Sequence, residues 1–188
     1  RSWQALEASA GGLSFVGLDG LTVSGSGLGV EINRAADDDT LINFATQALA
    51  VATGPDTSLT LDMNSAQGEL IRASGTVTLD LFGFFQVSGG FGFEQKIETV
   101  TLSNGNSIEV DMITIGTSDV SAFAGLNGST ADQLGFNLSD LDVALALMTD
   151  RANRTHKYTS LKAQAGGVAF VGVDGLTVAA DSLEVLIN

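Results

Sequence analysis

The segment from Trp3 to Asn33 reads WQALEASAGGLSFVGLDGLTVSGSGLGVEIN, and it returns from Tyr158 to Asn188 as YTSLKAQAGGVAFVGVDGLTVAADSLEVLIN. The two copies align without a gap at an offset of 155 residues, and 17 of their 31 positions are identical. Self-similarity at a fixed offset is the sequence signature of a repeat architecture. The 188-residue chain is therefore interpreted as one full period, residues 1–157, followed by the beginning of the next, residues 158–188.

A shorter motif recurs inside this long period. It consists of a small residue, Phe, a small residue or Val, Gly, an aliphatic residue, Asp or Asn, and Gly, and it occurs at Ser14–Gly20, Ala122–Gly128 and Ala169–Gly175. Asp-Gly and Asn-Gly pairs between apolar residues favour the tight turns of β hairpins. Repeats nested within a repeat therefore indicate an array built from hairpins.

The longest regular pattern runs from Ala73 to Phe93, where every odd position is apolar or glycine. A period of two sustained over this length predicts β structure, which glycines at Gly83 or Gly89-Gly90 bend or break into two strands. Two aromatic residues, Phe82 and Phe84, interrupt the even positions, which are otherwise mostly polar. Either another layer covers these two side chains, or they form an interaction patch for a neighbouring module on the polar side.

Three further segments carry local signals. A phase shift of the apolar pattern at Ser26-Gly27 predicts a β-bulge, and Asn104-Gly105 predicts a hairpin turn. The segment Thr40–Val51 is ambiguous. In a helix beginning near Asp39, Leu41 and later apolar residues would lie along one stripe, whereas in a strand successive side chains would point to opposite faces. The surrounding strand patterns favour a strand there.

These patterns predict an all-β fold. The preferred architecture is an elongated antiparallel β repeat, either a β-solenoid or a stacked sheet, and the alternative is a row of β-sandwich modules. The segments Trp3–Asn33 and Tyr158–Asn188 are expected to be equivalent and to pair with adjacent copies of the same repeat, which would cover the exposed strand edges.

Composition excludes several classes of function. The chain has 22 acidic and 8 basic residues and a net charge of −14, so it repels nucleic-acid phosphates. Although 44% of its residues are hydrophobic, no run approaches the roughly 18 apolar residues of a membrane span. The absence of cysteine excludes disulfides and thiolate metal sites.

No set of residues predicts an enzyme. Asp140 and Asp142 lie two positions apart, which predicts that they share one face of a strand. An acid/base pair for glycans also needs a cleft with aromatic platforms, however, and the chain has one Trp and one Tyr. His156 is the only histidine, and it lies in a basic loop without the partners that a zinc site needs.

Calcium is the one cofactor that the sequence suggests, and no cofactor is expected to be required. Asp37, Asp38 and Asp39 offer carboxylate oxygens to such a hard cation. A solvated acidic turn is the favoured interpretation, because three consecutive carboxylates cannot all face one ion.

The strings quoted above, together with LIRASGTVTLDLFGFFQVSGGFGFE, VDMITIGTSDVSAFAGLNG and LDVALALM, resemble the long tandem repeats of very large bacterial surface or secreted proteins of the adhesin-like type. The resemblance covers nearly the whole chain. It implies an extracellular or cell-surface location and a structural role as spacer or filament without catalysis. A binding module for adhesion or calcium-dependent contact is the alternative that it implies.

Overall fold

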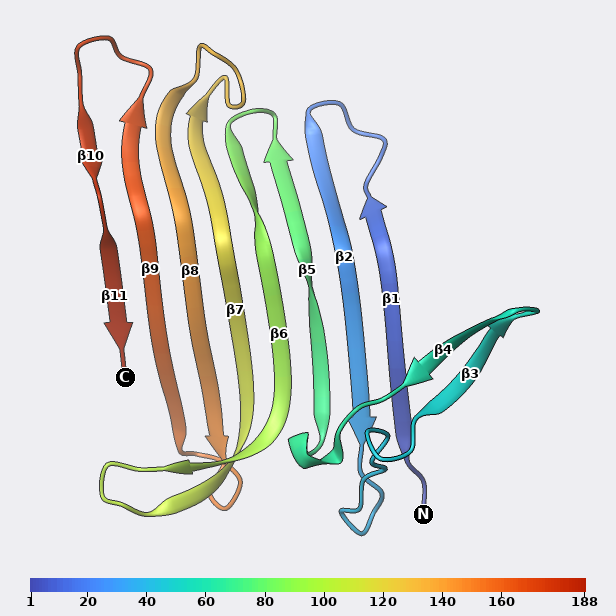
Figure 1. Cartoon of the computed structure of the whole chain (residues 1–188). Helices are drawn as coiled ribbons and strands as arrows, with labels where there is room; N and C mark the ends of the chain where they lie inside the picture. The colour runs from blue at the N-terminus through green and yellow to red at the C-terminus, as the bar shows by residue number, and fades with distance from the viewer.

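The computed structural model describes residues 1–188, and strands make up most of it (Figure 1). The only helical element is one 3-10 turn, η1 (Ser65–Gln67). The strands are β1 (Gln4–Ser14), β2 (Leu21–Arg34), β3 (Leu49–Gly54), β4 (Thr57–Leu61), β5 (Leu70–Leu81), β6 (Phe85–Thr101), β7 (Ser107–Leu126), β8 (Leu134–Asp150), β9 (Lys157–Val171), β10 (Val178–Ala180) and β11 (Leu183–Ile187).

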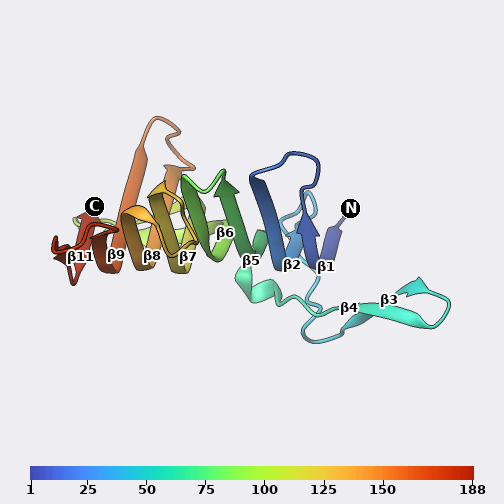
Figure 2. The same cartoon turned by 90° about the horizontal axis from the view of Figure 1, so that it is seen from above.

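Nine of the strands form one antiparallel sheet in the order β1-β2-β5-β6-β7-β8-β9-β10, and β11 continues beyond β10 along the same side of β9. Seen from above, these strands stand in a single row (Figure 2). The predicted all-β, elongated antiparallel fold is confirmed. The sheet is an open meander, so the chain shows neither the coils of a β-solenoid nor the facing sheets of a sandwich.

Alternation along the strands gives the sheet two unlike sides. Leu79 of β5 lies between Val23 and Val87 on the neighbouring strands, whereas Thr78 lies between Ser24 and Ser88. We call the side that carries Leu79 the apolar face and the side that carries Thr78 the polar face. Because no second layer covers the sheet, only 13 of the 188 residues are buried.

Register shifts cross the sheet near the middle of its strands. In β2 the pairing with β5 shifts between Ser26 and Gly29, and Gly27 adopts a φ of 57°. The bulge predicted at Ser26-Gly27 is therefore confirmed. A side chain at Gly75 of β5 would collide with Leu28, and one at Gly89 of β6 would collide with Val120. The glycines thus leave room for the larger residues of the bulged strands.

The hairpin β3–β4 is inserted between β2 and β5 and forms its own two-stranded sheet. Phe44, Leu61 and Met63 form a buried cluster that packs against Ala5 of β1. Asn33 at the end of β2 is buried beneath the insert and donates from Nδ2 to the carbonyl oxygen of Ile42, at 3.2 Å. Ala5 and Asn33 pair on the polar face, so the insert covers one end of that face only.

The strand predicted for Thr40–Val51 is wrong over most of its length. Residues 40–48 are irregular, and β3 begins only at Leu49. The physical reason is the docking of Phe44 in the cluster, where the amide of Ala45 donates to the carbonyl oxygen of Met63 at 3.1 Å. This contact with a distant residue overrides the local alternation.

The long pattern of Ala73–Phe93 breaks at Gly83, which is one of the two positions where a bend or break was predicted. Phe82 and Gly83 have φ angles of 55° and 68°, and the amide of Phe84 donates to the carbonyl oxygen of Leu81. Positive φ at both central residues is the geometry of a type I′ hairpin. Phe82 and Phe84 therefore belong to the turn between β5 and β6, and their predicted place on the polar face is wrong.

Hairpin turns occur at the dipeptides Asp19-Gly20 and Asn104-Gly105, as predicted. Gly20 and Gly105 have φ angles of 81° and 85°, and they close the hairpins β1–β2 and β6–β7. The three copies of the short motif all lie where β1, β7 and β9 end. These strands run in the same direction in the sheet, so the motif copies gather along one end of it (Figure 1).

Candidate functional site

The two copies of the repeated segment form the two edges of the sheet. At one edge Leu6 of β1 pairs with Ile32 of β2, and at the other Leu161 of β9 pairs with Ile187 of β11. Leu161 follows Leu6 by 155 positions, and Ile187 follows Ile32 by the same number. The register is the same along both hairpins, so the two copies fold to equivalent structures (Figure 1).

Each edge has a complementary surface elsewhere in the chain. The outer side of β1 is unpaired, yet the equivalent side of β9 pairs with β8 and places Leu161 beside Leu145. The outer side of β10 and β11 is also unpaired, whereas the equivalent side of β2 pairs with β5. The fold therefore contains, for each free edge, the strand that fits it.

The edge strand β1 lacks the features that usually prevent edge pairing. Natural sheets block their free edges with charged residues, prolines or β-bulges. In β1 there is one charged residue, Glu7, and no proline over 11 residues. One carboxylate oxygen of Glu7 is buried without a hydrogen-bond partner. A strand of this kind is suited to pairing with a further strand.

Ion pairs on the polar face join three strands near the insert. Arg72 of β5 donates to Glu31 of β2 at 2.9 Å and to Glu94 of β6 at 2.8 Å. Lys96 lies 2.8 Å from Glu98 and 3.3 Å from Glu94. The contacts of Arg72 join β5 to its two neighbouring strands in register.

The same contacts shift the pKa values of three groups. Partial burial acts to raise the pKa of Glu94, but its hydrogen bond to Arg72 and the charges of Arg72 and Lys96 outweigh burial and lower that pKa. The hydrogen bond with Glu98 raises the pKa of Lys96, and the same bond lowers the pKa of Glu98. All three groups are therefore held in their charged forms.

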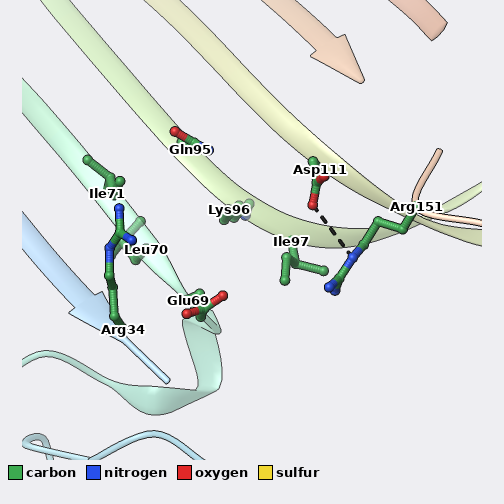
Figure 3. Close-up of a pocket in the computed structure, with 9 residues that line it drawn as sticks. All are labelled: Arg34, Glu69, Leu70, Ile71, Gln95, Lys96, Ile97, Asp111 and Arg151. Atoms are coloured by element: carbon green, nitrogen blue, oxygen red, sulfur yellow. Dashed lines mark ion pairs between the residues drawn. The ribbon is translucent and has the colours of Figure 1, made fainter. Parts of the chain in front are cut away.

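A shallow pocket lies where the apolar face meets the charged end of the sheet (Figure 3). Arg151, from the turn after β8, pairs with Asp111 of β7 at 3.6 Å, and Arg154 also pairs with Asp111. Glu69 accepts a hydrogen bond from the amide of Ala35. The pocket is lined by Arg34, Glu69, Leu70, Ile71, Gln95, Lys96, Ile97, Asp111 and Arg151. Asp111 and Arg151 bind each other, Glu69 binds a backbone amide, and Lys96 binds Glu94 and Glu98 outside the pocket.

Asp150 holds the turn between β8 and β9. Its Oδ1 accepts hydrogen bonds from the amides of Ala152, at 2.8 Å, and Asn153, at 3.1 Å. The bond from Asn153 is the main cause that lowers the pKa of Asp150, and it outweighs the effect of burial. His156 places Nδ1 3.6 Å from Oδ2 of Asp150, so the single histidine supports this turn.

Replacing Asp150 with Asn is expected to lower the melting temperature in a pH-dependent manner. A carboxylate whose pKa is lowered by folding stabilises the protein above its unfolded pKa of about 3.9, and this stabilisation is lost as the pH falls through the folded value. The difference between wild type and Asp150→Asn should thus be present at pH 7 and vanish at strongly acidic pH. Thermal melts followed by circular dichroism from pH 2.5 to 7 measure it. Asp56→Asn, in the exposed turn between β3 and β4, is the control for removal of a charge.

Among the three carboxylates that the sequence offers to calcium, that of Asp38 engages in other contacts. Asp38 pairs with Arg1 at 2.8 Å and accepts a hydrogen bond from Thr40 at 2.7 Å. No group of three or more His, Cys, Asp or Glu side chains is arranged to hold a metal ion. Calcium at Asp37, Asp38 and Asp39 stays a prediction.

Asp140 and Asp142 also differ from the sequence interpretation. Asp142 accepts a hydrogen bond from the amide of Asp119 at 3.0 Å, which holds the bulged part of β7 against β8. Asp140 has a φ of 50° and lies in the irregular part of β8. The irregularity breaks the alternation from which a shared face was predicted.

Phe82 and Phe84 are both 56% exposed at the turn between β5 and β6. The same end of the sheet carries further exposed apolar residues in its other loops, which are Phe15, Val16, Leu18, Leu126, Val173 and Leu176. The interaction patch therefore stays a prediction, at a corrected place. Sequence reasoning missed that the patch continues along this end, although the recurring short motif was the available signal.

Comparisons with protein-family models, with curated proteins and with solved structures found no match to this chain. The chain contains no helix with the length and hydropathy that a membrane crossing requires.

Proposed function

We propose that this chain is a structural repeat of a large bacterial extracellular or cell-surface protein. In this proposal successive periods extend one antiparallel sheet without interruption, and the resulting rod serves as a spacer or filament. It carries no catalytic function, and its partners are adjacent copies of the same repeat.

The observation that carries this proposal is the equivalence of the two edge hairpins. Because β9 with β10 and β11 has the register of β1 with β2, the strand β8 of a preceding period fits the free side of β1. By the same argument, the strand β5 of a following period fits the free side of β11. Tandem copies would then leave free edges only at the two ends of the array.

Continuity of the sheet gives the array its mechanical role. Backbone hydrogen bonds would cross every boundary between periods, so no flexible linker separates them. Each period contributes six strand positions, from β1 to β8 without the insert, and strands lie about 4.8 Å apart. The array would therefore lengthen by about 29 Å per period. The net charge of −14 per chain would keep such rods in solution.

Small-angle scattering on longer chains tests the proposal. The 155 residues from 34 to 188 are appended after Asn188 one to four times, so that each addition contributes one complete period and the chains hold two to five complete periods. The width of the array should increase by about 29 Å per added period, and the increase in the longest dimension should approach this value once the array is wider than its strands are long. Compact units on flexible linkers would instead give a dimension that grows more slowly with each period, together with the scattering profile of a flexible chain, and this result would contradict the proposal.

A binding module is the second candidate, and the exposed aromatic residues Phe82 and Phe84 favour it. In that case the apolar loops at one end of the sheet would contact the surface to which the protein adheres. Phe84→Asp should then reduce retention of the chain on an apolar resin while the melting temperature stays unchanged. Equal retention of wild type and Phe84→Asp would count against this second function.

A further inference from the structure

The apolar face of the sheet is open to solvent along its whole width. Large side chains on this face are substantially exposed on edge and central strands alike: Leu6 is 46% exposed, Phe91 42%, Leu147 39% and Val185 43%. Exposed apolar surfaces that extend across a whole sheet are rare on monomeric soluble proteins, and they mark sites of association. Other exposed residues of the face are Leu13, Val77, Phe85, Phe136, Val178, Leu183 and Ile187.

No other part of this chain covers the apolar face. The insert β3–β4 packs beside Ala5 and Asn33, which belong to the polar face. Charged groups approach the apolar face only at its end, where Glu69 and Asp111 line the shallow pocket. Between that end and the opposite loops, the regular strand positions of the face carry no charged side chain. The face is thus uncharged and mainly apolar, and its polar residues include Gln95, Thr117 and Thr159.

The shape of the sheet indicates what fits this face. Figure 1 shows the strands from β1 to β11 running side by side over their upper and middle parts with little fanning, whereas the connected ends of β6 and β7 bend across the lower ends of β8 and β9. Figure 2 shows the same strands in one row. Sheets of many strands are usually twisted, and flat ones are typically stabilised by stacking against another sheet. A flat apolar face therefore suits a second flat apolar face.

The size of the face is sufficient for a stable pair. Eight strand positions at about 4.8 Å give a width of about 38 Å, and about 11 residues per strand at about 3.4 Å give a height of about 37 Å. Two such faces in contact would bury about 2,800 Å² in total, which lies in the range of about 2,000–5,000 Å² for obligate homodimers.

We propose that the apolar face packs against the apolar face of a second copy of this chain, so that two sheets form a two-layered ribbon. The charged residues of the polar faces would then point outward on both sides, and the layers would lie about 10 Å apart. A lipid surface is the other apolar partner of suitable chemistry. Lipid does not require a flat sheet, so the flatness of the face favours a second copy.

The inference deepens the proposed function, because it names the lateral partner of the rod. It does not need the tandem array, however, since face-to-face pairing occurs within two copies of the 188-residue chain. Pairing through faces and extension through edges can therefore fail separately.

The test uses two glutamate substitutions on the same strand that point to opposite faces. Leu147 of β8 pairs with Ile113 on the apolar face, whereas exposed Ala144 pairs with Gly116 on the polar face. Sedimentation equilibrium of the 188-residue chain should show a dimer, and Leu147→Glu should weaken dimerisation at least 100-fold. Ala144→Glu should dimerise as wild type does. Circular dichroism confirms that both variants fold, and Phe91→Glu provides a second apolar-face variant.

Four results would overturn the pairing. One is a wild-type monomer at all concentrations, and another is an equal response to Leu147→Glu and Ala144→Glu. The third is a monomer that floats with phosphatidylcholine vesicles and loses flotation with Leu147→Glu, since this assigns the face to lipid. A dimer that persists in Leu147→Glu but is lost in Val185→Pro, at the free edge of β11, would indicate edge pairing. That outcome contradicts face pairing and leaves the proposed extension of the sheet intact.

Discussion

A Gly125→Val substitution is expected to destabilise the protein by about 3 kcal/mol, the upper part of the usual range for overpacking. Gly125 of β7 and Gly135 of β8 face each other in the sheet. A side chain at Gly125 would collide with the carbonyl oxygen of Leu134 and lie 2.6 Å from the Cα atom of Gly135. These are backbone atoms, so the two strands would have to separate to admit it. Urea denaturation at one fixed protein concentration measures the loss in free energy of unfolding.

Gly92→Val is the matched control. Gly92 lies in the interior of β6, and a side chain added there would meet no atom within 4 Å. Valine suits a strand better than glycine does and reduces the freedom of the unfolded chain, so this variant should be neutral or more stable by up to about 1 kcal/mol. Equal unfolding free energies for Gly125→Val and Gly92→Val would contradict the close approach of β7 and β8.

Phe44→Ala is expected to release the β3–β4 insert from the end of the sheet. Phe44 is 4% exposed and packs with Leu61 and Met63, and truncation of a buried Phe costs about 3–5 kcal/mol. Since this cluster belongs to the insert, the cost should appear as local opening rather than as unfolding of the whole sheet. Amide hydrogen exchange should accelerate in Leu49–Leu61 and remain unchanged in the centre of β7.

Ile42→Ala is the control for this prediction, because Ile42 lies in the same irregular segment but is 39% exposed. It should change exchange in the insert only slightly. If Phe44→Ala accelerated exchange equally in β4 and β7, the insert and the sheet would form a single cooperative unit, and the description of a separate docked hairpin would be wrong.

Most of the main sheet was predictable from local patterns. Alternation over Ala73–Phe93 gave the two strands β5 and β6, and the dipeptides Asp19-Gly20 and Asn104-Gly105 gave two of the hairpin turns. The repeated segment predicted equivalent structures at Trp3–Asn33 and Tyr158–Asn188, and both form hairpins of one register. These features depend on residues close in sequence, which is why pattern and turn chemistry suffice.

Features that depend on distant residues were not predictable. The irregular path of residues 40–48 follows from the docking of Phe44 against Leu61 and Met63, which the alternation of the segment does not reveal. The ion pairs of Arg72 require β5 to lie between β2 and β6, and Glu31 is 41 residues away. Nothing in the local sequence indicates that β2 pairs with β5 across the inserted hairpin.

The most direct test of the continuous sheet is hydrogen exchange at its free edge. In the 188-residue chain, alternate amides of Leu183–Ile187 point away from β9 and have no strand to accept their hydrogen bonds. In the two-period chain, the second copy of β5 should pair there as β5 pairs with β2, and exchange of these amides should slow by about a thousandfold, as in paired strands. If these amides exchange equally fast in both chains, the periods do not share a sheet, and the account of the protein as a continuous rod is contradicted.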